Sequence, residues 1–207
     1  MTELINQLGS EQKFANLNVI LVGLPGSGKS SLIDSMLIKP NYLSLGEITR
    51  NEVAKRRPMA TSIEEKFATD DPWPPEFVVG IVAPYILTAK EQGTGFVLDG
   101  IPRKSNEART LVRWIKENGL NIDLVLHLHI DPKIALRRIA TRSNAGRLET
   151  AAHYESRMRI YLKEEAEILR IMQLESMQNL TINTNDNPHG FAKQVLLSFV
   201  SDHFKGL

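Results

Sequence analysis

Short apolar segments alternate with amphipathic ones along the chain. Residues 17–22 (LNVILV) form an apolar run rich in β-branched side chains, and comparable runs end at Asp99 (FVLD), span 123–131 (DLVLHLHID) and cover 180–184 (LTINT). Short apolar runs that are bounded by turn residues are typical of buried parallel strands. The pattern by itself therefore predicts four strands.

The segments between these runs have the spacing of helices. Apolar residues recur three and four positions apart from 108 to 115, and a stop signal follows at Asn118-Gly119. Asp131-Pro132 supplies a cap and a first-position proline for another helix, and apolar positions between 191 and 200 fall on one helix face. Strands that alternate with amphipathic helices predict an α/β fold with a parallel sheet and right-handed crossovers.

Two stretches break this alternation. Residues 46–90 contain helical patterns and a proline-rich loop but no convincing strand, which predicts a small helical insertion. Residues 143–151 (SNAGRLETA) are polar, which is typical of a mobile flap. The length of 207 residues suits one domain, and we expect the first 16 residues to form a surface segment.

Composition narrows the classes of function. The chain has 25 Lys and Arg against 24 Asp and Glu, a net charge of +1, so no overall field attracts nucleic acid or an anionic membrane. It has no cysteine, which excludes thiol catalysis, disulfides and cysteine-based metal sites. The sequence contains no signal-peptide pattern and no apolar run of membrane-spanning length, so we expect a cytoplasmic protein.

Residues 23–30 (GLPGSGKS) match the P-loop pattern G-x-x-x-x-G-K-[ST] directly after the first predicted strand. Glycines there let backbone N–H groups approach phosphate oxygens, and the following helix adds the positive end of its dipole. We expect Lys29 to reach the β- and γ-phosphates and the Ser30 hydroxyl to bind Mg²⁺. The residues predicted to bind ATP through this loop are Gly23, Pro25, Gly26, Ser27, Gly28, Lys29, Ser30 and Ser31.

One acidic residue and several arginines are candidates for the rest of the site. Asp99 ends a predicted strand, where the second acidic residue of a P-loop protein faces magnesium, although an Asp there is also typical of a turn. The case for Asp99 as a functional residue depends on the segment that follows it, Gly100-Ile101-Pro102-Arg103. Transfer between two nucleotides needs several cations at one point. The candidates, each of which also suits a solvated helix face, are Arg50, Arg103, Arg138, Arg142, Arg147 and Arg157.

Several segments together resemble the nucleoside monophosphate kinase family, and adenylate kinases within it. They are GLPGSGKSS (23–31), YLSLGEITR (42–50), DPWPPEFV (71–78), GFVLDGIPR (95–103), RRIATR (137–142), GR (146–147) and RMRIY (157–161). The resemblance implies one P-loop kinase domain over 1–207, with three α/β/α layers and a five-stranded parallel sheet of order 2-3-1-4-5. It also implies that 42–45 form the second strand, that 46–90 bind a monophosphate and that 143–151 form a short lid.

The same resemblance implies roles for particular residues, with Mg²⁺ as cofactor and ATP as phosphoryl donor. The implied catalytic residues are Lys29, Arg103, Arg138, Arg142 and Arg157, and the arginines implied in ATP binding are Arg138, Arg142 and Arg147. The residues implied in monophosphate binding are Ser44, Gly46, Glu47, Arg50, Gly95, Arg103 and Glu107, with Gly95 beside the base. Ser30 and Asp99 are implied at the metal, with Asp99 and Glu47 acting through water. We expect a monomer that binds ATP and a nucleoside monophosphate, and neither nucleic acid nor membrane.

Three positions depart from the adenylate kinase pattern where the acceptor base is recognised. Leu45 stands for a hydroxyl residue, Trp73-Pro74-Pro75 for a Leu-Val-Pro step, and Glu107 for a glutamine. An ionised Glu only accepts hydrogen bonds, which suits a base edge with two donors, as in guanine, or an adenine or cytosine edge reached through water or a protonated group. Glu107 equally suits a surface helix position beside Arg103 or Arg109. The resemblance to the family implies AMP as the acceptor, and the acidic side chain of Glu107 makes this acceptor a prediction to be tested.

Two histidines and two other functions complete the sequence-based picture. His127 and His129 share one face of a predicted strand, but the sequence identifies no third ligand, so we expect no metal there. The chain lacks the N-K-x-D tetrapeptide of regulatory GTPases. A P-loop kinase of another small acceptor would keep Lys29 and Asp99 without needing Arg50 or Arg103. A nucleotide-binding protein that has lost catalysis fits the altered acceptor pocket as well.

Overall fold

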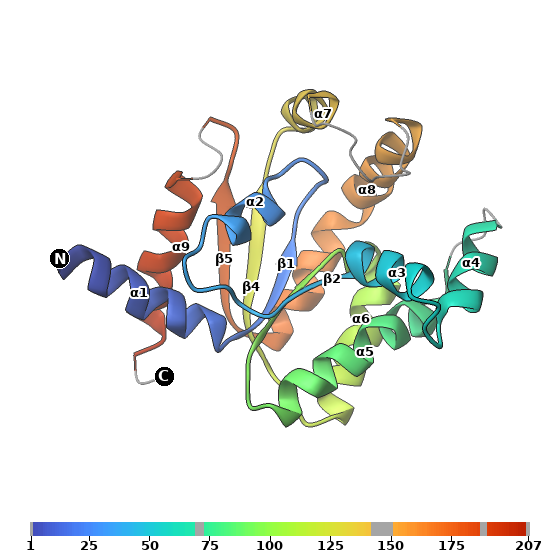
Figure 1. Ribbon diagram of the computed structural model, residues 1–207. Coiled ribbons are helices and arrows are strands. Elements are labelled where there is room, and N and C mark those ends of the chain that lie inside the picture. The colour runs from blue at the N-terminus through green and yellow to red at the C-terminus, as the bar shows by residue number, and fades with distance from the viewer. Residues whose placement is uncertain (1, 69–72, 142–150, 187–189, 206–207) are drawn as a thin grey trace.

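The computed structural model describes residues 2–68, 73–141, 151–186 and 190–205. In these ranges five parallel strands form one sheet in the order β2-β3-β1-β4-β5 (Figure 1). The strands are β1 (Asn18–Val22), β2 (Tyr42–Ser44), β3 (Phe96–Asp99), β4 (Ile122–His129) and β5 (Ser176–Asn183). The predicted α/β class and sheet order are confirmed, and the second strand expected at 42–45 is observed as Tyr42–Ser44.

Helices cover both faces of this sheet, and two separate apolar cores lie beneath them (Figure 1). One face carries α1 (Thr2–Ala15), α2 (Lys29–Asp34) and α9 (Gly190–His203). The other carries α5 (Pro75–Glu91), α6 (Ser105–Glu117) and α8 (Ala151–Glu175). The remaining helices are α3 (Leu45–Ala54), α4 (Ala60–Ala68) and α7 (Pro132–Ala140).

The alternation of side chains along the strands builds the two cores. In β1, Val19 and Leu21 pack toward α1, α2 and α9, whereas Ile20 and Val22 pack toward α5, α6 and α8. All four side chains are at most 3% exposed. Each buried side chain of this size contributes roughly 1.5–3 kcal/mol, so both faces hold the strand in its register.

Local sequence signals place most element boundaries close to where they were expected, and the start of β5 is the main exception. The Asp131 side chain accepts a hydrogen bond from the N–H of Lys133 at 2.7 Å and so caps α7. By contrast, β5 begins at Ser176 rather than at 180, directly after the last residue of α8. Its first residues alternate between exposed and half-buried positions, so an apolar run marks only the second half of the strand.

Of the two segments predicted to interrupt the alternation, the structure describes most of 46–90 and almost none of 143–151. Within the described residues of 46–90, the elements are α3, α4 and most of α5, and no strand is present. The expected flap at 143–151 lies outside the described residues except for Ala151, the first residue of α8. Across the described ranges, no helix has both the length and the apolar character needed to cross a membrane.

The N-terminal segment is a helix held in place by a buried carboxylate. Glu11 of α1 is 0% exposed, and its Oε2 accepts hydrogen bonds from the backbone N–H groups of Leu37 at 2.7 Å and Ile38 at 2.8 Å. Its Oε1 accepts from Gln7 and pairs with Lys193 of α9 at 2.7 Å. Burial alone would raise the pKa of Glu11, but these hydrogen bonds and the Lys193 charge outweigh it and hold the pKa below its usual value.

We predict that Glu11→Gln lowers the free energy of unfolding at neutral pH by roughly 1–3 kcal/mol, because hydrogen bonds to a buried charge are replaced by weaker ones. A carboxyl whose pKa is lowered by folding stabilises the folded state at pH values above its pKa in the unfolded chain, about 4.3. This stabilisation is lost as the pH falls through the lower pKa of the folded state. The deficit of Glu11→Gln should therefore shrink in acid, as measured by urea denaturation at several pH values. Glu91→Gln, at an exposed position, is the control, and a deficit independent of pH would contradict the assignment.

Candidate active site

A cleft lies at the carboxyl end of the sheet, where β1, β2 and β3 finish at the same edge. Parallel pairing places Asp99 of β3 between Leu21 of β1 and Ser44 of β2, so residues from distant parts of the sequence meet there. The cleft encloses a cavity of about 200 Å³. Its lining comes from the P-loop, β2, α3, the segment after β3, and α8. A crevice outside the carboxyl ends of parallel strands is the usual place for a ligand in open α/β sheets.

The P-loop has the backbone that its glycines were predicted to supply. Gly26 and Gly28 have φ of +90° and +94°, a region that other residues rarely adopt. A Cβ on Gly26 would also lie 2.7 Å from the carbonyl oxygen of Ala135, and one on Gly23 would lie 2.5 Å from that of Leu128. The loop therefore packs tightly on β4 and α7 while lining the cleft.

Lys29, Asp99 and Tyr42 form the polar floor of the cleft. Lys29 Nζ donates to the carbonyl oxygens of Gly23 at 2.7 Å and Leu24 at 3.1 Å, and lies 3.8 Å from Asp99 Oδ1. Asp99 Oδ2 accepts a hydrogen bond from the Tyr42 hydroxyl at 2.6 Å. Burial and the charge of Asp99 raise the pKa of Tyr42, so this hydroxyl stays a proton donor at neutral pH. Tyr42 thus fixes the carboxylate with its other oxygen toward Lys29.

Three arginines from different elements reach the cleft: Arg50 of α3, Arg103 after β3, and Arg157 of α8. The backbone N–H of Arg103 donates to Glu107 Oε2 at 2.7 Å, and the Glu107 side chain is buried beneath this segment. Together with Lys29 these groups surround one cavity with positive charge, while Glu47 and Asp99 supply carboxylates. Such a lining suits a phosphorylated ligand with a bound cation.

Most of the residues predicted for the site line the cleft. They are Gly23, Pro25, Gly26, Gly28, Lys29, Ser30, Ser44, Gly46, Glu47, Arg50, Asp99, Arg103 and Arg157. Ser27, Ser31 and Glu107 adjoin it without being part of its lining. Arg142 and Arg147 lie outside the described residues, so their predicted roles stay predictions.

Two predicted residues lie elsewhere. Gly95 precedes β3, at the opposite end from Asp99, and a Cβ there would come within 2.6 Å of backbone atoms of Asn16 and Leu17. Its glycine is required by close packing of the chain, so the placement of Gly95 beside an acceptor base was wrong. Arg138 does not line the cleft, and its Nη2 donates to the carbonyl oxygens of Thr184 at 2.5 Å and Asn185 at 3.1 Å.

Six lining residues were not predicted from the sequence: Leu21, Val22, Tyr42, Gly100, Pro102 and Tyr161. Gly100 and Pro102 belong to the segment that was used to identify Asp99 and Arg103, so their position in the sequence could have indicated them. Tyr42 shares a face of β2 with Ser44, so the two-residue strand period could have indicated it. Tyr161 is four residues after Arg157 on α8, on the same helix face.

The fold and the loop at 23–30 define the class of P-loop α/β proteins. A family model described as adenylate kinase matches residues 21–177. The chain belongs to the adenylate kinase family. It is 35% identical to adenylate kinase 4 of Arabidopsis thaliana over 146 residues, which cover 69% of this chain and 58% of that protein.

Two microbial relatives are similar over comparable lengths. The chain is 36% identical to an adenylate kinase of Methylobacterium nodulans over 131 residues, 61% of this chain and 64% of that protein. It is 26% identical to an adenylate kinase of Pyrococcus horikoshii over 141 residues, 67% of this chain and 63% of that protein. The matches thus span about three fifths of the length of these relatives.

Proposed function

We propose that the protein transfers the γ-phosphoryl group of ATP to a nucleoside monophosphate, with AMP as the acceptor expected from its family. One arrangement carries the proposal. The P-loop with Lys29 and Asp99 lines one cleft together with Arg50 and Arg103, which belong to the segments expected to bind a monophosphate. A P-loop kinase of an acceptor without a phosphate would have no use for this second pair of cations.

In the proposed reaction, an oxygen of the acceptor's phosphate attacks the γ-phosphorus of ATP. The new bond joins that oxygen to phosphorus, and the bond to the bridging oxygen of ADP breaks, so no side chain acts as nucleophile. Lys29 would stabilise charge on the β- and γ-phosphates, and Arg157 with Arg103 would stabilise the group in transfer. Arg138, Arg142 and Arg147 are proposed to bind the ATP side.

The cleft also fits a magnesium ion. Asp99 Oδ1 is buried and, among the residues that the structure describes, has no hydrogen-bond partner, and the Ser30 hydroxyl lines the same cavity. Oxygen ligands of this kind are those that Mg²⁺ prefers. Ser30 would hold the ion directly, with Asp99 and Glu47 acting through water. When bound with ATP, Mg²⁺ would neutralise charge on the phosphate oxygens.

The acceptor side is proposed to involve Arg50 and Arg103 on the phosphate, with Ser44, Gly46 and Glu47 nearby. If Gly46 carried a Cβ, that atom would lie 3.4 Å from the Arg50 guanidinium. A Cβ on Gly100 would lie 3.5 Å from the Arg103 guanidinium. Glu107 is proposed to act on this side through Arg103, since its carboxylate accepts from the Arg103 N–H. The apolar side chain of Leu45 packs against Gly100, where a hydroxyl was expected by family.

The proposal is tested with the purified chain, Mg²⁺-ATP, and AMP, GMP, CMP and UMP in parallel, following formation of ADP. We expect turnover that depends on the monophosphate and is fastest with AMP. If another monophosphate reacted fastest, the proposed reaction would stand and the acceptor would be that monophosphate. Binding of ATP without turnover on any of them would contradict the proposal and favour a nucleotide-binding protein without catalysis.

We predict that Arg103→Ala lowers kcat/KM for the monophosphate at least about tenfold, because a charge-assisted phosphate contact contributes roughly 1.5–3 kcal/mol. Steady-state kinetics with the monophosphate varied at saturating ATP measures this loss. Arg109→Ala is the matched control, since Arg109 of α6 pairs with Glu167 on the surface. Equal kinetics of Arg103→Ala and Arg109→Ala would remove Arg103 from the acceptor site.

We predict that Glu107→Ala raises KM for each monophosphate by a similar factor and leaves their order unchanged. The physical reason is that its carboxylate holds the backbone of Arg103, which would contact the phosphate common to all acceptors. In Glu107→Gln the amide oxygen can still accept that hydrogen bond, so KM should stay close to the parent value. A changed order of acceptors in Glu107→Gln would show instead that this side chain contacts the base.

A further inference from the structure

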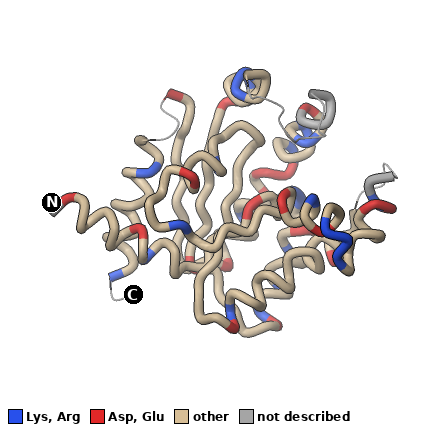
Figure 2. Tube along the Cα trace, viewed as in Figure 1, with Lys and Arg blue, Asp and Glu red and all other residues tan. Residues whose placement is uncertain are grey.

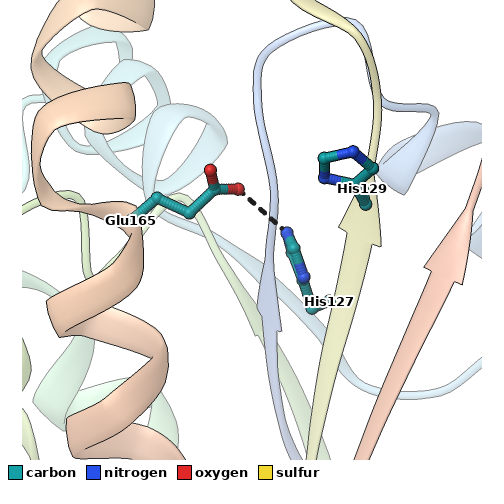
Figure 3. Close-up of side chains that lie close together, drawn as sticks. All are labelled: His127, His129 and Glu165. Atoms are coloured by element: carbon teal, nitrogen blue, oxygen red, sulfur yellow. Dashed lines mark hydrogen bonds and ion pairs between the residues drawn. The ribbon is translucent and has the colours of Figure 1, made fainter.

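A second group of polar side chains lies on the α8 face of the sheet, apart from the residues that line the cleft. His127 and His129 extend from β4 on the same face, and Glu165 reaches them from α8 (Figure 3). One nitrogen or oxygen from each residue lies within 4.8 Å of the other two. Glu165 is a candidate third ligand that the sequence could not identify, because it belongs to a helix distant along the chain.

The ring of His127 is held at both of its nitrogens. Nε2 lies 3.0 Å from Glu165 Oε1, and Nδ1 lies 3.4 Å from the Thr181 hydroxyl on β5. The residue is 5% exposed, so its ring has little freedom to turn. In the tautomer with the proton on Nδ1, the Thr181 hydroxyl accepts a hydrogen bond from it and the Nε2 lone pair is available to a metal; in the other tautomer, Nε2–H donates to the Glu165 carboxylate. Histidines that bind metals commonly have the second ring nitrogen hydrogen-bonded in this way.

Without a metal, a proton on His127 Nε2 bridges the 3.0 Å between this nitrogen and Glu165 Oε1, and a metal ion bound here would replace that proton. A proton would satisfy His127 and Glu165 alone. The adjacent His129 ring, with its centroid 5.8 Å from that of His127, adds a third lone-pair donor that a proton would not use. Around a tetrahedral Zn²⁺ with bonds of about 2.0–2.1 Å, ligand atoms lie about 3.3 Å apart. His127 and Glu165 are near that spacing, and His129 is exposed and can approach by side-chain rotation.

We propose that His127, His129 and Glu165 bind a divalent transition-metal ion of the Zn²⁺ class, with water as a further ligand. Two imidazoles and one carboxylate form a donor set typical of zinc, whereas Mg²⁺ prefers oxygen ligands such as those of the cleft. The bound metal ties α8 to β4. Arg157, Tyr161 and Glu165 follow at four-residue intervals on α8, so the metal holds the helix that carries Arg157 to the cleft. The site does not depend on the proposed kinase activity.

The test is titration of the full chain, stripped of metal with a chelator and transferred to buffer without Mg²⁺. We expect isothermal titration calorimetry to show Zn²⁺ bound at this site, Tm to rise on binding, and excess Mg²⁺ to leave the Zn²⁺ in place. Co²⁺ in place of Zn²⁺ should give the intense visible absorption of tetrahedral coordination. His129→Ala and Glu165→Gln should each weaken Zn²⁺ binding at least about tenfold.

The control is His203→Ala, which removes an exposed imidazole on α9 and should bind Zn²⁺ as the parent does. His129 is exposed at the last position of β4, so His129→Ala is expected to fold as the parent and keeps the test decisive. Absence of Zn²⁺ binding by the parent overturns the proposal. Unchanged affinity in either His129→Ala or Glu165→Gln also overturns it, because the ion would then be held elsewhere.

Discussion

The parallel pairing of β3 with both β1 and β2 is the constraint on which the site depends. Leu21, Asp99 and Ser44 lie side by side at the ends of three strands, and the cleft opens above them. Because strand side chains alternate between faces, a slip of one residue would turn Asp99 away from Tyr42 and Lys29. Val97 and Leu98 are buried in opposite cores, so apolar packing on both faces fixes that register.

The electrostatics of the cleft follow from the same arrangement. The chain has a net charge of only +1, yet Lys29 and three arginines from separate elements line one cavity. Elsewhere positive charges meet carboxylates on the surface, as Arg109 and Arg170 do with Glu167. Figure 2 shows charged residues on the outer helices, whereas the central strands are largely uncharged. A nearly neutral chain can therefore present a cleft in which positive side chains outnumber the carboxylates of Glu47 and Asp99, because other balancing charges lie at a distance.

The sequence predicted those parts of the molecule whose signals are local. The P-loop, the cap at Asp131 and the apolar strands each depend on a few adjacent residues, and each appears close to where it was expected apart from the start of β5. Gly95 was misplaced because two glycines flank the strand that ends at Asp99, and only the packing against Asn16 and Leu17 distinguishes them. The carbonyl partners of Arg138 likewise come from the end of β5, which no local pattern reveals.

The N-terminal segment was the least predictable part of the fold. Phe14 and Leu17 are buried in the core shared with α9, but that partner lies at the other end of the chain, so their apolar character alone did not define a packed helix. Glu165 was overlooked for the same physical reason. Its neighbours on β4 are close in space and far along the sequence, and a carboxylate on an amphipathic helix is ordinarily solvated.

The helix pair α1 and α9 has a consequence for how such a protein can vary. Both helices lie outside residues 21–177, the region that the family model matches, and yet together with α2 they cover one face of the sheet. Glu11 connects α1 to the peptide groups that follow α2, the helix that begins with Lys29 of the P-loop. The backbone that follows α2 is thus held in part by a residue outside the matched region, so sequence change in this peripheral layer acts next to the P-loop helix while every residue of the family pattern is left intact.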